Sequence, residues 1–141
     1  MRKTLLSFFS ICLLLTFVSC PSSVSLSSQK DLTSFTFTAS KNNSLSQDAA
    51  GAISGTGITL NVPAGTDVTT LIADFVSTGE SVTVNTIAQV SGTTANDFTS
   101  PLTYQVIAED GSTQNYLVTV IFYMVTGLMP VDGSATGESS A

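Results

Sequence analysis

The sequence predicts an all-β sandwich of about six or seven short strands. Apolar and polar residues alternate in several short segments, which is the period of a strand with one buried face. Turn-forming Gly, Pro, Asn and Asp separate these segments at intervals of about 8–12 residues. Thr, Ser, Val and Gly are abundant, and only 10% of the residues are charged. This composition favours strands over helices.

The N-terminal segment has the features of an export signal. Arg2 and Lys3 precede an apolar run from Leu5 to Val18, which is shorter than the roughly 20 residues of a membrane-spanning helix. The residues that end this run, Phe17-Val18-Ser19-Cys20, resemble the bacterial lipobox, in which a small residue precedes the lipid-accepting Cys. The resemblance implies a lipoprotein signal peptide over residues 1–19, cleavage before Cys20, and acyl chains on its sulfur and new amino group. The alternative is an ordinary signal peptide whose cleavage site lies near a cysteine.

Several acyl chains on Cys20 would hold the protein on a membrane stably, where a single chain holds only marginally. Pro21 follows the cysteine, and not the Asp that resembles an inner-membrane retention signal. In a bacterium with two membranes we therefore expect an exported protein on the outer membrane or cell surface. Residues 20–29 are rich in Ser and without periodicity, which predicts a flexible tether.

The folded domain is expected over residues 30–123, and its first half contains two predicted strands. In the first strand, Phe35 and Phe37 share one side, and Leu32 lies on the other. Residues 41–51 are polar and turn-like. Residues 52–62 form one strand with an irregular, Gly-containing start, and residues 63–67 end it with turn chemistry.

The second half contains one ambiguous segment and one long connector. Residues 68–75 predict a loop or a single helical turn, because they are too short for an independent helix. A turn over 77–80 and a short strand within 81–86 follow. In the connector 89–102 we expect Phe98 to plug an end of the core, and Asn96 and Asp97 to form side-chain turns.

The clearest element is a β-hairpin over residues 103–121. Tyr104 and Val106 share one face of its first strand, and Tyr116 and Val118 share one face of its second. The Asp-Gly of the intervening Glu109-Asp110-Gly111-Ser112 predicts a tight turn. Residues 124–141 lack periodicity and predict a flexible C-terminal tail. The pattern leaves open whether the natural protein continues past Ala141 as the first module of a longer chain.

Composition excludes several classes of function. The chain has no His and no Trp, and no Cys follows Cys20, so the usual zinc, haem and iron–sulfur sites, Cys nucleophiles and His-dependent triads are absent. We expect no cofactor. Beyond the signal segment, only Lys30 and Lys41 oppose the ten acidic residues, which argues against a nucleic-acid partner.

Four polar residues are the candidates for a ligand or calcium site: Asn96, Asp97, Glu109 and Asp110. Calcium takes several oxygen ligands from loops, but the spacing of a known calcium loop is absent, and the same residues are common in turns. Glu109 and Asp110 also form a carboxylate pair of the type that glycosidases use, although neighbouring residues of an exposed turn lack a cleft.

The tyrosines offer a further possibility, since exposed aromatic rings stack on sugars. Tyr104 and Tyr116 lie in the core phase of their strands and are expected to be buried, with each hydroxyl reaching a partner. Tyr123 is the one tyrosine expected at the surface. Four phenylalanines are expected in the core, namely Phe35, Phe37, Phe75 and Phe98.

Longer runs of the sequence carry a family resemblance. They are LTSFTF, GAISGTGITLNVPAGTDVTTL and SGTTANDFTSPLTYQVIAEDGSTQNYLVTV. Together they resemble a bacterial surface-lipoprotein domain with a cadherin-like or immunoglobulin-like β-sandwich. The resemblance implies a single Ig-like sandwich that serves as a spacer, an adhesin module or a glycan-associated surface domain.

We therefore predict a non-enzymatic, membrane-anchored surface lipoprotein with a structural, adhesive or protein-interaction role. The alternative is a glycan-binding accessory module of a surface polysaccharide-handling system, which would call for an exposed aromatic platform. A hydrolase would need a polar cleft that the pattern does not show. Membrane contact is expected through Cys20, with a protein or glycan as ligand.

Overall fold

The computed structural model describes residues 24–124. The signal peptide, Cys20 and all but the first residue of the predicted tail lie outside this range. The described chain is all-β, as predicted, and it contains no helix. Accordingly, residues 24–124 contain no helix that is long and apolar enough to cross a membrane.

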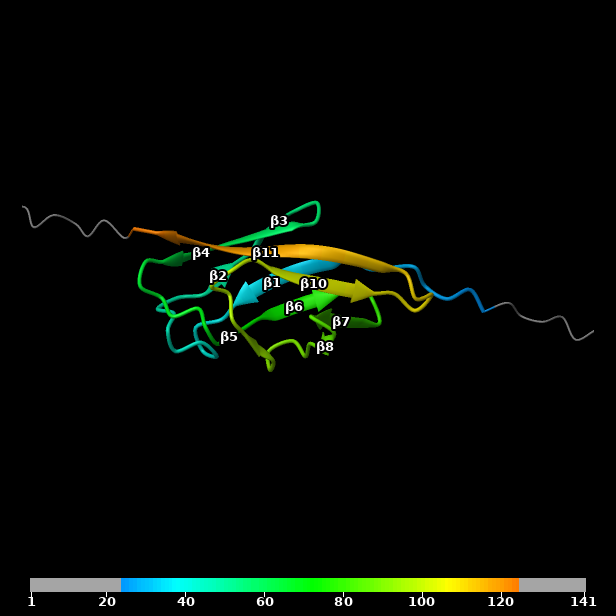
Figure 1. The fold of residues 1–141 in the computed structure, drawn as a ribbon, viewed down its shortest axis with the longest axis horizontal. Helices are drawn as coiled ribbons and strands as arrows, with labels where there is room; N and C mark the ends of the chain where they lie inside the picture. The colour runs from blue at the N-terminus through cyan, green and yellow to red at the C-terminus, as the bar shows by residue number, and fades with distance from the viewer. Residues whose placement is uncertain (1–23, 125–141) are drawn as a thin grey trace, which may run out of the picture.

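The strands form three sheets that build a sandwich-like domain (Figure 1). The six-stranded mixed sheet has the order β3 (Ala52–Ser54), β4 (Gly57–Pro63), β11 (Thr113–Tyr123), β10 (Leu102–Ile107), β7 (Ser81–Val84) and β8 (Ile87–Ala88). The three-stranded sheet has the order β2 (Ala49–Ala50), β1 (Leu32–Phe37) and β6 (Asp74–Ser77). The short pair is β5 (Leu71–Ile72) with β9 (Ala95–Asn96).

The predicted hairpin is confirmed as β10 and β11, and it occupies the middle of the large sheet. Tyr104 and Val106 are fully buried on one face, together with Tyr116 and Val118 of the paired strand. The turn is a three-residue turn, since Ala108 pairs with Ser112 across it. Gly111 has φ +80°, a conformation that glycine adopts without a steric penalty and that commonly ends this kind of turn.

The other side of β11 pairs with β4 in parallel, from Leu117 with Gly57 to Tyr123 with Pro63. Parallel pairing needs a long connection, and here the connection is most of the domain, from β5 to β10. This topology places β11 between strands from both halves of the chain. Nothing in the alternation pattern predicted which strand would flank β11 on that side.

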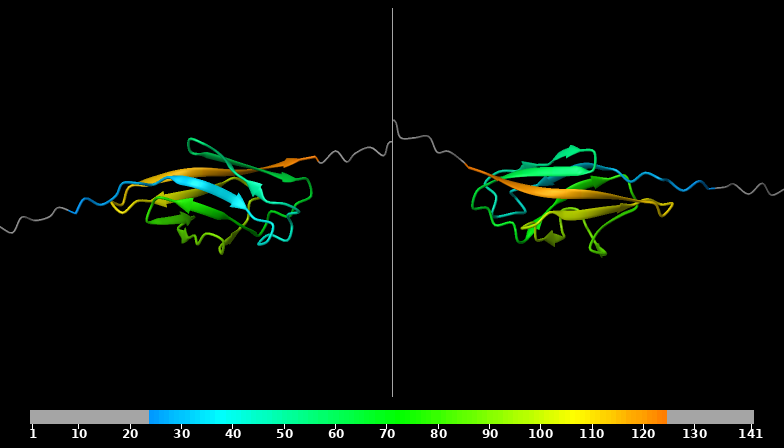
Figure 2. Two further views of the ribbon diagram at one scale, coloured as in Figure 1. Left: turned by 180° about the vertical axis from the view of Figure 1, so that it is seen from behind. Right: turned by 45° about the horizontal axis from the view of Figure 1, so that its top comes forward.

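The two main sheets face each other across an aromatic core (Figure 2). The Phe35 ring of β1 lies edge-on to Tyr104 of β10, with ring centroids 5.0 Å apart. Phe37 meets Phe98 edge-on at 4.9 Å, and Phe98 is buried, so its predicted place in the core is confirmed. Phe75 is partly buried and stacks on Phe35 at 6.3 Å. Edge-on and offset-stacked rings of this kind add to the stabilisation from burial.

Several local predictions are wrong because tertiary contacts override the pattern. Residues 52–62 are two strands, β3 and β4, joined by a turn at Gly55-Thr56. Residues 68–75 contain β5 and the start of β6 where we expected a loop or a helical turn. Leu32 is buried on the side of Phe35 because the β1–β6 register shifts between Leu32 and Ser34, and such a bulge reverses the facing of the residues beyond it.

Close packing at Gly79, in the bend between β6 and β7, generates a stability prediction. A Cβ atom there would collide with Cγ1 of Val106 and lie 2.7 Å from the backbone O of Ile107. We expect Gly79→Ala to lower the free energy of unfolding by about 1–3 kcal/mol, because a full core has no room for the methyl group. Urea denaturation would measure this change.

The matched control is Gly57→Ala. Its nearest neighbour would be the Ser54 backbone O at 3.5 Å, an ordinary contact, so the stability should change by less than about 0.5 kcal/mol. Equal unfolding midpoints for Gly79→Ala and the unmodified protein would contradict the packing argument.

Candidate functional site

The four predicted ligand residues are divided between two places in the fold. Asn96 and Asp97 precede the start of β10, and Glu109 and Asp110 follow its end. Within residues 24–124, no group of three or more His, Cys, Asp or Glu side chains is arranged to hold a metal ion. The four side chains are therefore not brought together as one cluster.

Glu109 and Asp110 hold the turn and the incoming N-terminal segment. The Asp110 carboxylate accepts hydrogen bonds from the Ser112 hydroxyl at 2.6 Å and the Ser112 backbone N–H at 2.8 Å. These bonds lower the pKa of the Asp110 carboxyl. Oε2 of Glu109 accepts from the backbone N–H of Ser27 at 3.0 Å, and the Ser27 carbonyl accepts from the Asp110 N–H at 3.1 Å. The turn thus binds the end of the predicted tether.

Asp97 and Asn96 act differently from one another. Oδ1 of Asp97 accepts from the Thr99 backbone N–H at 2.9 Å, which confirms the predicted side-chain turn. Asn96 forms no such turn, because its Nδ2 donates to Oε1 of Gln89 at 2.7 Å and to the Tyr104 hydroxyl at 3.1 Å. The Tyr104 hydroxyl is buried and needs a partner. The same burial raises its pKa well above the ordinary range.

The tyrosine predictions are largely confirmed. Tyr104 and Tyr116 are buried. Tyr123 is half-buried, and its hydroxyl accepts from Nε2 of Gln47 at 3.2 Å. Phe122 next to it is 50% exposed, which the sequence pattern did not indicate. Adjacent residues of a strand point to opposite faces, so Phe122 and Tyr123 do not form one aromatic platform.

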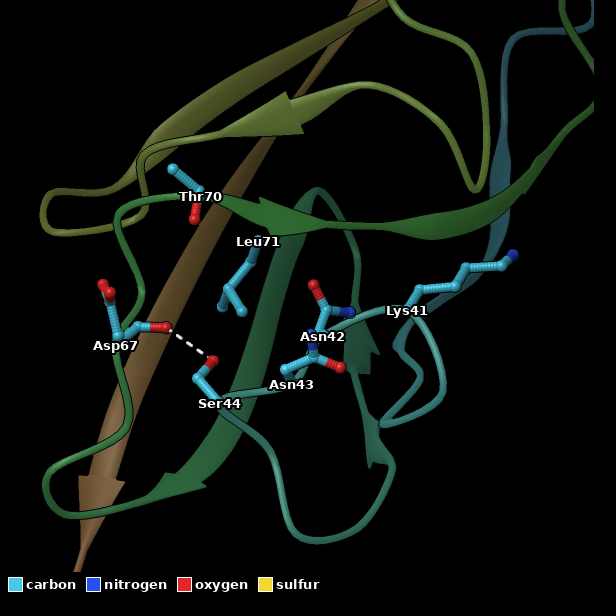
Figure 3. Close-up of a pocket in the computed structure, with 7 residues that line it drawn as sticks. All are labelled: Lys41, Asn42, Asn43, Ser44, Asp67, Thr70 and Leu71. Carbon is cyan, nitrogen blue, oxygen red and sulfur yellow. Dashed lines mark hydrogen bonds between the residues drawn. The ribbon is translucent and has the colours of Figure 1, made fainter.

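Two hollows remain as candidate sites, and the first lies among loops at one end of the sandwich. This end hollow has a volume of about 270 Å³. Figure 3 shows the residues that line it. They are Lys41, Asn42, Asn43, Ser44, Asp67, Thr70 and Leu71.

Most polar groups of the end hollow hold loops together. The buried side chain of Asn42 makes the two hydrogen bonds with β5 that a neighbouring strand would make. Its Oδ1 accepts from the Ile72 N–H at 2.7 Å, and its Nδ2 donates to the Ile72 carbonyl at 2.9 Å. Ser44 donates to the Asp67 carbonyl at 2.8 Å, drawn as a dashed line in Figure 3. Lys41 extends away and pairs with Asp74. These bonds give the end hollow a structural role.

The second hollow lies on the outer face of the six-stranded sheet. This face hollow has a volume of about 230 Å³ and is lined by Thr83, Asn85, Thr86, Thr103, Gln105 and Asn115. Asn115 of β11 pairs with Gln105 of β10, which in turn pairs with Thr83 of β7. The three side chains form a row across neighbouring strands, with a span of about 10 Å.

The groups of the face hollow are uncharged and mostly available. Nε2 of Gln105 donates to Oδ1 of Asn115 at 3.1 Å. No partner for the Thr83 or Thr103 hydroxyl is found among residues 24–124. Strands β4, β7, β10 and β11 contain no charged residue. The hollow therefore presents donors and acceptors without a net charge.

A strained turn borders the face hollow. Asn85 and Thr86 connect β7 to β8 with φ values of 49° and 69°. Two-residue hairpin turns with two positive φ values favour Asn-Gly, and a β-branched residue in this region is a genuine outlier. Such conformations cost on the order of 1–3 kcal/mol and are frequent at functional sites. The alternation pattern predicted the end of a strand here and gave no sign of the turn.

Sequence reasoning also missed the face hollow as a site. Four of its residues occupy outward positions of strands, and Asn85 and Thr86 lie in the turn between β7 and β8. The one signal that the sequence offered was an absence: four strands that prove to be neighbours contain no charged residue. Which outward residues share a row depends on strand order and register, and these came only from the structure.

Comparison with known proteins identifies the class. Residues 32–120 match the family described as SGBP, N-terminal, in which SGBP denotes a surface glycan-binding protein. This match covers more than half of the sequence, and the chain belongs to this family. The comparison with curated proteins gave no match.

Two solved structures are similar to the chain. A candidate glycoside hydrolase from Bacteroides thetaiotaomicron is 29% identical with a TM-score of 0.51, and the match covers 71% of this chain. The chain spans only 27% of that structure's length. A candidate secreted protein from Bacteroides fragilis is 17% identical with a TM-score of 0.44, and 67% of this chain and 95% of that one are covered.

The Lys41–Asp74 pair at the edge of the end hollow generates a prediction on pH. The hydrogen bond from Lys41 lowers the pKa of the Asp74 carboxyl, partial burial opposes this, and the Thr38 hydroxyl at 2.8 Å contributes further lowering. A lowered folded-state pKa stabilises the fold fully above the unfolded value of about 3.9, and the contribution is lost as pH falls through the folded value. Asp74→Asn should therefore have a lower urea midpoint at pH 7 and a smaller further loss between pH 5 and pH 2.

The control for this prediction is salt. Because both side chains are partly exposed, 1 M NaCl should reduce the difference between the two proteins at pH 7. An identical pH dependence of the unfolding midpoint in both proteins would show that the pair does not contribute.

Proposed function

We propose that the chain is a non-catalytic glycan-binding module of a bacterial cell surface. The observation that carries this proposal is the match of residues 32–120 to the SGBP, N-terminal family. It favours the glycan-binding alternative over the purely structural or adhesive role that the sequence patterns suggested first. The secreted character of the protein follows from the same family and from the export signal at the N-terminus.

A non-catalytic role fits the chemistry of the described residues. Glycosidases place two carboxyl groups on either side of the scissile bond. Glu109 and Asp110 are neighbours in an exposed turn, and their oxygens are bound to Ser27 and Ser112. The similarity to a candidate glycoside hydrolase involves 27% of that protein, so it supports no transfer of its activity.

The proposed organisation has four parts. Residues 1–19 are the signal peptide, and residues 20–29 are the tether, with acyl chains on Cys20. Residues 30–123 are the Ig-like or cadherin-like sandwich, and residues 124–141 are the tail. The protein would thus be held on the outer membrane or cell surface, where extracellular glycans are accessible.

A second function, that of a spacer, is favoured by the positions of the described chain ends. The blue segment that leads into β1 lies at one end of the long axis, and the orange end of β11 lies at the other (Figure 1). A module with this arrangement extends the distance between a membrane anchor and whatever follows it. Both functions are compatible in one protein, because the spacer role concerns the ends and glycan binding concerns a surface.

The glycan-binding function is tested by a binding screen. The mature chain would be offered a panel of neutral and acidic polysaccharides and a panel of host matrix proteins. We expect retention by at least one polysaccharide in affinity electrophoresis, without release of reducing sugar. Binding to matrix proteins alone would favour the adhesive role, and silence across both panels would leave the spacer role.

Lipid attachment at Cys20 makes a separate prediction. In a bacterial host, Cys20→Ala should shift the protein from the membrane fraction to the soluble fraction and remove the added acyl mass, because no other acceptor thiol follows the signal segment. Ser19→Ala, which keeps a small residue before the cysteine, is the matched control and should remain in the membrane. Unchanged mass and membrane association in Cys20→Ala would refute the anchor.

A further inference from the structure

The face hollow has the chemistry of a site for an uncharged sugar, and we propose that it binds a neutral saccharide chain. This inference rests on the proposed glycan-binding function and adds to it the place and the class of glycan. The end hollow is the alternative location, but its polar atoms are used to hold loops.

The face hollow supplies both hydrogen-bond donors and acceptors. Sugar hydroxyls both donate and accept, and a site for them needs both kinds of partner. The amide side chains of Asn115 and Gln105 each carry a donor and an acceptor, and the Thr83 hydroxyl can act as either. The row that these residues form on three strands follows the face of the sheet, so an extended chain of sugar units can lie along it.

Two side chains of the face hollow are preorganised for binding. The hydrogen bond from Nε2 of Gln105 to Oδ1 of Asn115 fixes two long side chains before a ligand arrives. It leaves Oε1 of Gln105 and Nδ2 of Asn115 for a ligand. Side chains already held in place lose less conformational entropy on binding.

An exposed apolar side chain lies beside the face hollow. Leu117 is the register partner of Thr103 and is 50% exposed. It therefore lies on the outer face directly beside a residue that lines the hollow. The C–H faces of a sugar ring are apolar and can pack on such a side chain. This contact takes the place of the aromatic platform that is not found in the described range.

The charge distribution around the face hollow favours neutral over acidic glycans. The four central strands are uncharged, and the two lysines of the domain lie elsewhere, with Lys30 bound to Ser112 and Lys41 bound to Asp74. A uronate or sulfate group would thus meet no cation at the hollow, and it would approach a protein of formal charge −6. Electrostatic complementarity of this kind selects against the wrong partners.

The turn at Asn85-Thr86 supports the same site. Glycine would relieve the positive φ of Thr86, but it would also remove from the rim of the hollow a hydroxyl that donates to the Asn85 carbonyl at 2.5 Å and can still accept from a ligand. Thr86 is thus unfavourable for the backbone conformation of the turn, while its hydroxyl is available to the site. Residues of this kind are expected where binding is gained at the expense of stability.

Isothermal titration calorimetry on the purified mature chain in detergent tests the inference. The probes are laminarin, xylan and mannan as neutral chains, with polygalacturonate and alginate as acidic ones. We expect a neutral chain to bind and the acidic chains to bind at least 10-fold more weakly. The double variant Gln105→Ala and Asn115→Ala should lose at least 10-fold in affinity, and Asn43→Ala, at the end hollow, should stay within twofold.

A second variant separates binding from folding. Thr86→Gly should bind the neutral chain at least threefold more weakly and unfold at a higher temperature, a combination that general damage cannot produce. Preference for an acidic chain, or a double variant that binds within twofold of the unmodified protein, would overturn the assigned site and glycan class while the glycan-binding function stands. Binding to none of the five probes would overturn both proposals.

Discussion

The fold depends on the burial of one aromatic cluster between the two main sheets. Tyr104 lies at its centre, edge-on to Phe35 and Phe75 and stacked with Phe98 at 6.4 Å. A domain of this size without a disulfide in its described part has few other sources of stability, since each large side chain contributes about 1.5–3 kcal/mol when buried. The buried hydroxyl of Tyr104 accepts a hydrogen bond from Asn96, and this bond holds β9 against the core.

The outward-facing side chains of the large sheet take no part in packing this core. The inward residues of β10 and β11 supply the packing, so the outward residues of the same strands can vary without loss of the fold. In this chain they are hydroxyl, amide and aliphatic side chains, and the few charges lie in turns and at the ends. The interior is fully packed, whereas the exterior of the large sheet is uncharged and can form hydrogen bonds. The face hollow on this exterior is therefore suited to a ligand.

Much of the fold could be predicted because its main signals are local. The alternation of Tyr104 with Val106 and the Asp-Gly turn belong to a single stretch of sequence, and both identified the central hairpin. The two-residue strand β5 could not be predicted, because it is defined by its pairing with the distant β9 and is held on its other side by hydrogen bonds with the Asn42 side chain. The side of Leu32 was misjudged because a bulge reverses the alternation. The face hollow escaped prediction because it is assembled from three strands whose order the sequence does not encode locally.

The central position of β11 has a mechanical consequence. Figure 1 shows β1 and β11 both running along the long axis, with the described chain ends at opposite extremes. A pull on the C-terminal end of the described chain would act along β11, at right angles to its hydrogen bonds with β4 and β10. The seven register pairs with β4 and the six with β10 would then share the load in shear. A strand peeled from the edge of a sheet would instead lose its hydrogen bonds one at a time. A lengthwise pull on β11 therefore meets more resistance than the same pull on an edge strand would.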